Sequence, residues 1–268
     1  MKTLNFVKMV GTGNDFVLVD NRRGAIVKAP DAARRLCDRK LSIGGDGLLL
    51  AERSKKADLR MRILNPDGSE AEMCGNGVRC FAKFALDKRF AGKSLTIETL
   101  AGLIRADVKG DVVKARMIDP SDLRMDLTLR VDGRSENVHF VNTGVPHVVK
   151  VLDTVEGVDV ERFGRLIRCH ADFAPRGTNA NFIAFRGDGT LDVRTYERGV
   201  EGETLACGTG STASALVAAR LKGLRSPVRV RTHGGETLKI YFSKEGQKFY
   251  DVYLEGKVKK TFEGTVGL

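Results

Sequence analysis

The sequence predicts an α+β fold with two similar lobes that arose by internal duplication, each a curved, mostly antiparallel β-sheet wrapped around a central α-helix. Two observations support this prediction. Segments with strand-like alternation are common while helical segments are few, and the sequence around Cys74 recurs around Cys207. A length of 268 residues suits one large domain or two of ordinary size. With 42% hydrophobic and 29% charged residues, the composition is that of a globular protein with a substantial core.

Alternation of apolar and polar residues predicts strands in the first half of the chain, at residues 4–10, 58–64, 94–100, 103–108 and 112–118. Residues 29–40 and 158–168 have the amphipathic pattern of surface helices. The two most apolar helices are expected directly after Cys74 and Cys207. The second contains "STASALVAARL", which is small or apolar nearly all round, as is typical of a helix buried on every side.

The duplication is visible in the order of features on both sides of each cysteine. Residues 58–108 and 190–242 each contain a strand, an acidic loop, Cys-Gly-x-Gly, an apolar helix and a strand-turn-strand. The cysteines are 207 − 74 = 133 positions apart, a period far too long for a solenoid, so two related domains are expected. We expect an N-terminal lobe of residues 1–119, to which 258–268 return, and a C-terminal lobe of residues 120–257. The active site is expected in the cleft between the lobes.

Composition argues against several classes of protein. The five cysteines are scattered without a CxxC pair, so no metal site is expected. Because no apolar run reaches the length of a membrane span and the N-terminus lacks a signal-peptide pattern, we expect a cytoplasmic protein with no membrane partner. The net charge of +11 is spread among 34 acidic residues, which indicates a solvated basic surface rather than nucleic-acid binding. A basic nucleic-acid-binding module, with both cysteines buried as packing residues, is the alternative from another class.

The position of the two cysteines indicates acid–base chemistry. The first N–H groups of a helix have no intrahelical partner and the helix dipole is positive there, so a thiol at that end loses its proton more easily. The neighbouring glycines expose N–H groups to which a carboxylate can bind. Two such groups facing one carbon could invert its configuration, one removing a proton and the other delivering one. The remaining cysteines, at positions 37, 80 and 169, are interpreted as packing residues.

No cofactor is expected, because no phosphate-binding GxGxxG follows a strand and no P-loop is present. With these residues in view, the chain resembles the diaminopimelate epimerase family over essentially its whole length. The segments that carry the resemblance are "KMVGTGNDF", "NPDGSEAEMCGNGVR", "GTNANF" and "ERGVEGETLACGTGS". The resemblance implies a pyridoxal-phosphate-independent isomerase that interconverts LL- and meso-diaminopimelate for lysine and peptidoglycan synthesis. It also implies a homodimer that acts on a small molecule.

The resemblance also implies a role for each site residue. Cys74 and Cys207 would be the catalytic base and acid, in an order for each stereoisomer that the sequence leaves open. Donors to the carboxylate at the reacting centre would come from Gly75, Asn76, Gly208 and Thr209. The distal amino-acid end would be held by Asn14, Asn65, Asn181 and Arg198. Glu197 would accept from a substrate ammonium, and His147 would lie near a cysteine and help to set its ionisation.

Each of these residues also has a purely structural interpretation. Asn14 and Asn65 suit turns, Glu197 and Arg198 could form a surface pair, and His147 could be a hydrogen-bonded core residue. The chain departs from many family members at Gly47, where they have glutamine, and at Val145, where they have asparagine, which removes two polar contacts to substrate. A proline or hydroxyproline racemase-type isomerase remains the enzymatic alternative, although those substrates lack a distal amino-acid end. PhzF-like relatives are a weaker alternative, since they lack the paired cysteines.

Overall fold

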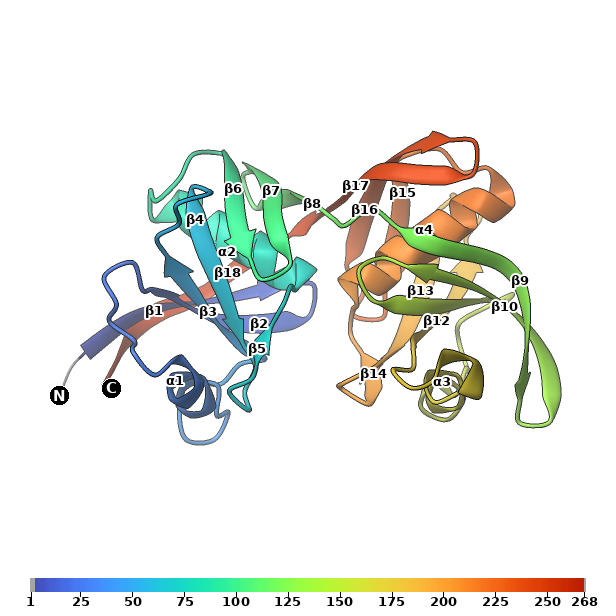
Figure 1. The fold of residues 1–268 in the computed structure, drawn as a ribbon, viewed down its shortest axis with the longest axis horizontal. Helices are drawn as coiled ribbons and strands as arrows, with labels where there is room; N and C mark the ends of the chain where they lie inside the picture. The colour runs from blue at the N-terminus through green and yellow to red at the C-terminus, as the bar shows by residue number, and fades with distance from the viewer. Residues whose placement is uncertain (1–2, 268) are drawn as a thin grey trace. The chain divides into compact units, whose positions relative to one another are not determined.

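The computed structural model describes residues 3–267, which form two compact units (Figure 1). Unit 1 contains the described residues up to Arg116 and those from Gly256 onward, and unit 2 is Met117–Glu255. Both units are rich in β-strands and contain few helices, which confirms the predicted α+β class. Within the described residues no helix combines the length and the apolar character needed to cross a membrane.

Five strands of unit 1 occur where alternation predicted them, both of its helices lie in segments expected to be helical, and the first helix is shorter than the predicted residues 29–40. The elements of unit 1 are β1 (Thr3–Gly11), β2 (Asn14–Asp20), α1 (Ala29–Leu36), β3 (Gly47–Glu52), β4 (Leu59–Leu64), β5 (Glu70–Ala71), α2 (Gly75–Asp87), β6 (Ser94–Thr99), β7 (Gly102–Lys109), β8 (Val112–Arg116) and β18 (Lys259–Gly267). The elements of unit 2 are β9 (Ser121–Val131), β10 (Arg134–Asn142), β11 (Pro146–Val151), α3 (Val160–Arg168), the 3-10 helix Ala171–Phe173, β12 (Asn179–Phe185), β13 (Leu191–Glu197), β14 (Gly202–Thr204), α4 (Gly208–Lys222), β15 (Val228–Thr232), β16 (Thr237–Glu245) and β17 (Lys248–Lys257). The last residues of β17 pass into unit 1.

The strand pairings of the two units are the same. In unit 1, β18 pairs with β1, β1 with β2, β3 with β4, β4 with β5, β6 with β7 and β7 with β8, all antiparallel. The pairs β2–β3 and β4–β6 are parallel. Unit 2 repeats this order from β9 to β17, with β11–β12 and β13–β15 as its parallel pairs. The predicted duplication and mostly antiparallel sheets are therefore confirmed.

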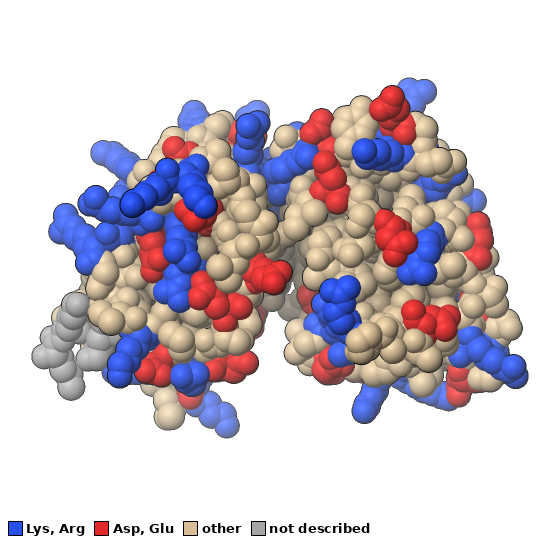
Figure 2. Space-filling model, viewed as in Figure 1, with Lys and Arg blue, Asp and Glu red and all other residues tan. Residues whose placement is uncertain are grey.

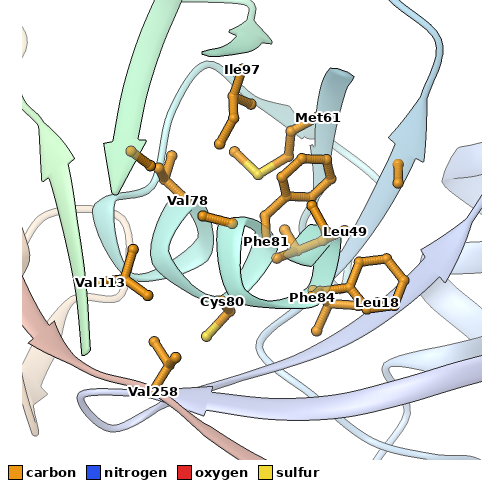
Figure 3. Packing of buried hydrophobic residues seen from close by; sticks show 14 of the residues in the cluster. Leu18, Leu49, Met61, Val78, Cys80, Phe81, Phe84, Ile97, Val113 and Val258 are labelled. Carbon is orange, nitrogen blue, oxygen red and sulfur yellow. The ribbon is translucent and has the colours of Figure 1, made fainter. Parts of the chain in front are cut away.

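Helix α2 fills the centre of unit 1. Its apolar side chains point toward strands on several sides, with Phe81 near Met61 and Ile97, and Cys80 toward Val258 (Figure 3). All of these residues are buried. Burying each large side chain of this kind contributes about 1.5–3 kcal/mol, so the helix is held by its packing rather than by its own short length.

Strand β3 is apolar on both faces because both are covered. Leu49 and Ala51 pack in the cluster around α2, whereas Leu48 and Leu50 pack in a second cluster with α1. Alternation of side chains across a strand explains this division. In unit 2, α4 occupies the place of α2, with every residue from Gly210 to Ala219 buried, and α3 packs on β12 and β13 through a separate cluster.

Charged side chains are mixed on the surface. On the face drawn in Figure 2, basic and acidic side chains are mixed over unit 2 and the lower part of unit 1, whereas basic side chains predominate at the upper left of unit 1. Many of these charges form ion pairs. One pair recurs at equivalent places: Arg62 binds Glu70 across β4 and β5 at 2.7 Å, and Arg194 binds Glu203 across β13 and β14 at 2.7 Å.

Candidate active site

Cys74 and Cys207 have the same local structure. Each is the N-cap of a buried central helix, with extended backbone angles, and the Sγ atom of each accepts a hydrogen bond from the N–H group three residues later. The distance from Sγ to nitrogen is 3.4 Å for Cys74 and Gly77, and 3.3 Å for Cys207 and Gly210. Each thiol therefore takes the capping role that Ser, Thr, Asp or Asn usually has. The two differ in burial, since Cys74 is half-buried and Cys207 is buried.

In unit 1 the predicted residues Asn14 and Asn76 are brought together at the start of α2. Nδ2 of Asn76 donates to Oδ1 of Asn14 at 2.6 Å, and Asn76 is itself held by the buried Arg79, whose guanidinium donates to Asn76 Oδ1. Arg79 also donates to Thr12 Oγ1 at 2.9 Å and to the carbonyl of Gly75 at 3.3 Å. Arg79 thus fixes the first turn of α2 to the turn between β1 and β2.

Charged residues continue this network away from the helix. Nδ2 of Asn14 donates to Asp46 at 3.1 Å, and Asp46 pairs with Arg39 at 2.7 Å. Arg39 and Lys8 both contact Asp15, at 2.6 and 2.7 Å. Burial raises the pKa of Asp15, but hydrogen bonds from Arg39 and Lys8 outweigh it and hold that pKa well below its usual value. Asn14 therefore has a fixed orientation at the edge of an ionised cluster.

Two further positions of unit 1 are explained by local geometry. Asn65 begins a turn, where its N–H donates to the carbonyl of Ser69 at 2.8 Å and its Nδ2 donates to Ser69 Oγ at 3.0 Å. A substrate contact by Asn65 remains a prediction. At Gly47, a Cβ atom would lie 3.1 Å from the carbonyl oxygen of Leu64 and 3.4 Å from the ring of Phe16. The backbone there approaches its neighbours closely, so a side chain at this position would require them to move by a few tenths of an ångström.

In unit 2, Glu197 is the group that most affects Cys207. Burial raises the pKa of Cys207 well above its ordinary value, and the negative charge of Glu197 raises it further, while hydrogen bonding to Thr209 and to the N–H of Gly210 opposes the increase. Burial likewise raises the pKa of Glu197, and hydrogen bonding to Thr204 and to the Cys207 thiol partly offsets this increase. Oγ1 of Thr209 lies 3.4 Å from the Cys207 sulfur. The structure thus brings Glu197, Cys207 and Thr209 together, as expected of one site.

His147 and Asn181 form a buried pair on adjacent parallel strands. Nδ2 of Asn181 lies 3.1 Å from Nδ1 of His147 and donates to the carbonyl of Val148 at 2.8 Å. Oδ1 of Asn181 accepts from Thr195 Oγ1 at 3.0 Å. Burial lowers the pKa of His147 to about 3, and the positive charge of Arg198 acts in the same direction. Asn181 was expected to contact substrate directly. That role remains a prediction, and all three of these hydrogen bonds stay within the protein.

Arg198 projects from the end of β13 among other cations. Its Nη1 donates to the carbonyl of Arg176 at 3.1 Å, and its pKa is lowered by burial and by the nearby charges of Arg168 and Arg176. Such a group of cations favours binding of an anion. The backbone N–H of Arg198 donates to Oδ1 of Asn179 at 2.8 Å, and Asn179 in turn donates to the carbonyl of Pro146 at 3.0 Å.

Sequence reasoning missed Asn179 and Arg79. Asn179 ties the segment carrying Glu197 and Arg198 to the segment carrying His147. The signal was available, because "GTNANF" places Asn179 and Asn181 two residues apart and so on one face of a strand. Arg79 was detectable as the one charged residue in the first two turns of a mostly apolar helix. The equivalent position in α4 is Thr212, which is also buried and donates to the carbonyl of Gly208 at 2.9 Å.

Within the described residues, no group of three or more His, Cys, Asp or Glu side chains is placed to hold a metal ion. Each central helix begins at a thiol, Cys74 in unit 1 and Cys207 in unit 2. Asn14, Asn76 and Arg79 surround one of these starts. Glu197, Thr209, Asn181 and His147 surround the other or lie directly behind it.

Comparison with solved structures defines the class of this fold. A PhzF-family phenazine biosynthesis protein from Bacillus anthracis has a TM-score of 0.79 at 18% identity, with all of both chains covered. A probable proline racemase from Agrobacterium radiobacter has a TM-score of 0.72 at 16% identity, covering 99% of this chain and 93% of that one. At these identities the likeness concerns the fold alone. The protein therefore has the duplicated α+β fold that PhzF proteins and proline racemases share.

Comparison of sequences is more specific. The sequence model of the family described as diaminopimelate epimerase matches residues 6–122 and residues 139–261. Diaminopimelate epimerase from Aquifex aeolicus is 44% identical over 275 residues, covering 97% of each chain. The enzyme of that name from Archaeoglobus fulgidus is 43% identical, covering 98% of this chain and 96% of its own. The chain belongs to the diaminopimelate epimerase family.

Proposed function

We propose that the protein interconverts LL- and meso-diaminopimelate by two-base proton transfer at an α-carbon. Family membership at 44% identity over nearly the whole chain supports the epimerase activity and its substrate. The observation that carries the mechanism is the equivalence of Cys74 and Cys207, each capping the central helix of one copy of a duplicated fold. A duplicated acid–base group suits a reaction in which a proton leaves one face of a carbon and arrives on the opposite face.

In the proposed reaction one cysteine acts as a thiolate and removes the α-proton, so that the C–H electron pair is left on the substrate and an S–H bond forms. The other cysteine then gives its proton to the opposite face, which restores the C–H bond with inverted configuration and leaves a thiolate. Backbone N–H groups of Gly75 and Asn76, and of Gly208 and Thr209, bind the adjacent carboxylate as it gains negative charge. Such donors need no reorganisation, because the first N–H groups of a helix already point outward.

We further propose that Cys207 is a protonated thiol in the substrate-free enzyme, because burial and the charge of Glu197 both raise its pKa.

The distal end of the substrate is assigned to the cationic group at Arg198. Its fork of donors suits a carboxylate, and Asn179 and Arg176 hold its backbone and side chain in place. Glu197, with its carboxylate close to Cys207, is proposed to accept from a substrate ammonium. We keep Asn14 and Asn65 as proposed polar contacts from unit 1.

Incubation of the enzyme with LL-diaminopimelate in deuterated water tests the function. We expect deuterium at the inverted α-carbon and formation of the meso isomer without added pyridoxal phosphate, followed by NMR and mass spectrometry. L-Proline is the control substrate, and no exchange is expected with it. Absence of exchange at saturating diaminopimelate would count against the assignment, whereas exchange with proline alone would point to the racemase-type alternative.

Substitution of single cysteines tests the two-base mechanism. Cys74→Ala and Cys207→Ala are each expected to abolish epimerisation, because each removes one of the two proton carriers. Cys169→Ala is the matched control, since Cys169 is exposed and lies at the end of α3, and it should retain normal turnover. Normal turnover by either of the first two variants would show that a single thiol suffices.

We also propose that the enzyme is a cytoplasmic homodimer that binds no nucleic acid. The homodimer follows from the family resemblance, and the 34 acidic residues spread among 45 basic ones along the chain support the absence of nucleic-acid binding. Sedimentation equilibrium tests the first statement. Filter binding of DNA and RNA at several salt concentrations tests the second, because electrostatic binding would weaken steeply with salt.

A further inference from the structure

His147 carries a buried polar atom that the protein itself leaves unused. The residue is the second of β11, is fully buried, and its Nε2 has no hydrogen-bond partner in the part of the chain that the structure describes. A buried polar group without a partner costs about 1–3 kcal/mol. A native protein keeps such a group where a ligand completes its hydrogen bonding or where a function depends on it.

The protonation of His147 follows from its neighbour. The carbonyl of Val148 can only accept, so the Asn181 atom 2.8 Å from it must be the amide nitrogen. The Oδ1 atom of Asn181 then faces the hydroxyl of Thr195. The second N–H of the Asn181 amide is directed at His147 Nδ1, 3.1 Å away, which must therefore accept. A neutral imidazole with an accepting Nδ1 bears its proton on Nε2.

The neutral form agrees with the surroundings of His147. Burial removes water from the ring and the positive charge of Arg198 acts in the same direction, so that the pKa of His147 falls to about 3. At neutral pH the unpartnered atom is thus an N–H donor rather than an acceptor. The group missing from the protein is an acceptor.

The proposed substrate contains only one kind of acceptor. At neutral pH its two ammonium groups only donate and its hydrocarbon chain does neither, which leaves the carboxylate oxygens. We propose that Asn181 holds His147 as a neutral imidazole with its proton on Nε2, and that a carboxylate oxygen of the bound substrate accepts the hydrogen bond from that Nε2–H. The identity of the acceptor rests on the proposed function, whereas the tautomer does not. Asn181 is then a positioning residue behind His147.

The tautomer can be measured directly by 15N NMR of histidine-labelled protein. We expect the His147 pattern of a protonated Nε2 and an unprotonated Nδ1 in the substrate-free enzyme. His139 is the internal reference, because its Nδ1 accepts from the backbone N–H of Asp126 at 3.1 Å and should show the same tautomer. Asn181→Asp, which replaces the donor by an acceptor, should move the His147 proton to Nδ1 and leave His139 unchanged. A protonated Nδ1 in the unaltered enzyme would overturn the proposal. This measurement does not depend on the folding of any variant.

The acceptor is tested by adding meso-diaminopimelate to the Cys207→Ala variant, which is expected to bind the substrate without turning it over. The Nε2–H proton of His147 should move downfield, while the His139 signal stays in place. In the otherwise unaltered enzyme, His147→Leu should raise KM about 10–100-fold, the loss expected for a hydrogen bond to a charged group. His147→Gln, which keeps a donor near the position of Nε2, should have a KM between those of the unaltered enzyme and His147→Leu. An unchanged His147 signal in a variant shown to bind substrate would refute the carboxylate acceptor.

These outcomes separate the two proposals. If no deuterium exchange occurs with diaminopimelate but His147 still has its proton on Nε2, the proposed function fails and the tautomer stands. If exchange occurs and the His147 signal responds to alkylation of the cysteines rather than to substrate, the acceptor is a thiolate, and the assignment to the substrate carboxylate is wrong.

Discussion

Replacing Gly210 by alanine should destabilise unit 2, whereas the equivalent change at Gly77 should not harm unit 1. Both glycines are the third residue after a capping cysteine and donate their N–H to its sulfur. A Cβ atom at Gly210 would overlap Oδ1 of Asn181, well inside the 3.0 Å that real Cβ contacts respect, and would lie 3.2 Å from Cβ of Cys207. At Gly77 the nearest atoms are the Cys74 Cβ at 3.5 Å and the Leu49 Cδ2 at 3.6 Å, which are ordinary contacts.

The size of the effect follows from what Asn181 holds. To admit a methyl group the amide must move, which weakens its hydrogen bonds to Val148, Thr195 and His147. Each lost bond costs about 1 kcal/mol, and overpacking of a filled core about 1–3 kcal/mol. Alanine recovers about 0.5–1 kcal/mol relative to glycine within a helix. We expect Gly210→Ala to lower the free energy of unfolding by about 2–4 kcal/mol, and Gly77→Ala to leave it unchanged or raise it by up to about 1 kcal/mol.

Guanidinium denaturation followed by circular dichroism measures both variants against the unaltered protein. The shift should appear at the midpoint without a change in slope. The same 15N NMR experiment should show a disturbed His147 signal in Gly210→Ala only. Equal stability of the two variants would refute the reasoning, because their helices differ at these positions chiefly in the presence of Asn181.

Three further predictions concern charge and hydrogen bonding. Glu197→Gln should lower the pKa of Cys207, since the carboxylate charge raises it. Alkylation of Cys207 by iodoacetamide at pH 8 should therefore be faster, as measured by peptide mass spectrometry with exposed Cys169 as the standard. An unchanged rate would contradict an interaction between Glu197 and Cys207. Arg79→Met should lower the free energy of unfolding, measured by urea denaturation, by about 3 kcal/mol, because three oxygen atoms lose a charged donor. The equivalent change Thr212→Val should lower it by about 1 kcal/mol. Similar losses for the two variants would show that the hydrogen bonds of Arg79 do not stabilise unit 1 in this way. Asp15→Asn should destabilise the protein at neutral pH. Because the folded-state pKa of Asp15 is lowered, the stability that its ionised form contributes is present above the unfolded pKa of about 3.9 and is lost as pH falls further. A stability difference between the two proteins that persisted undiminished at pH 2–3 would be inconsistent with this.

Local features of the structure were largely predictable from sequence, and long-range contacts were not. Alternation identified five strands of unit 1, and the repeated Cys-Gly-x-Gly identified both central helix starts. The pairing of His147 with Asn181 depends on two strands that are parallel neighbours, which no local pattern reveals. The same holds for Arg79, whose partner Thr12 lies in a turn far away in the sequence. The expected lobe limits and the action of both cysteines on one carbon remain predictions.

The connectivity of unit 1 has a consequence for biosynthesis. One edge of strand β1 is paired with β18, which is formed by residues 259–267. In unit 2 the strand equivalent to β18 is β9, which comes directly before its partner β10 in the sequence. On the ribosome, the second unit can therefore assemble nearly all of its sheet while the first, although made earlier, still lacks an edge. Until residues 259–267 have been made, β1 presents unpaired backbone groups on that side, so a nascent chain halted just before residue 259 should be a preferred target of chaperones that bind exposed strand edges.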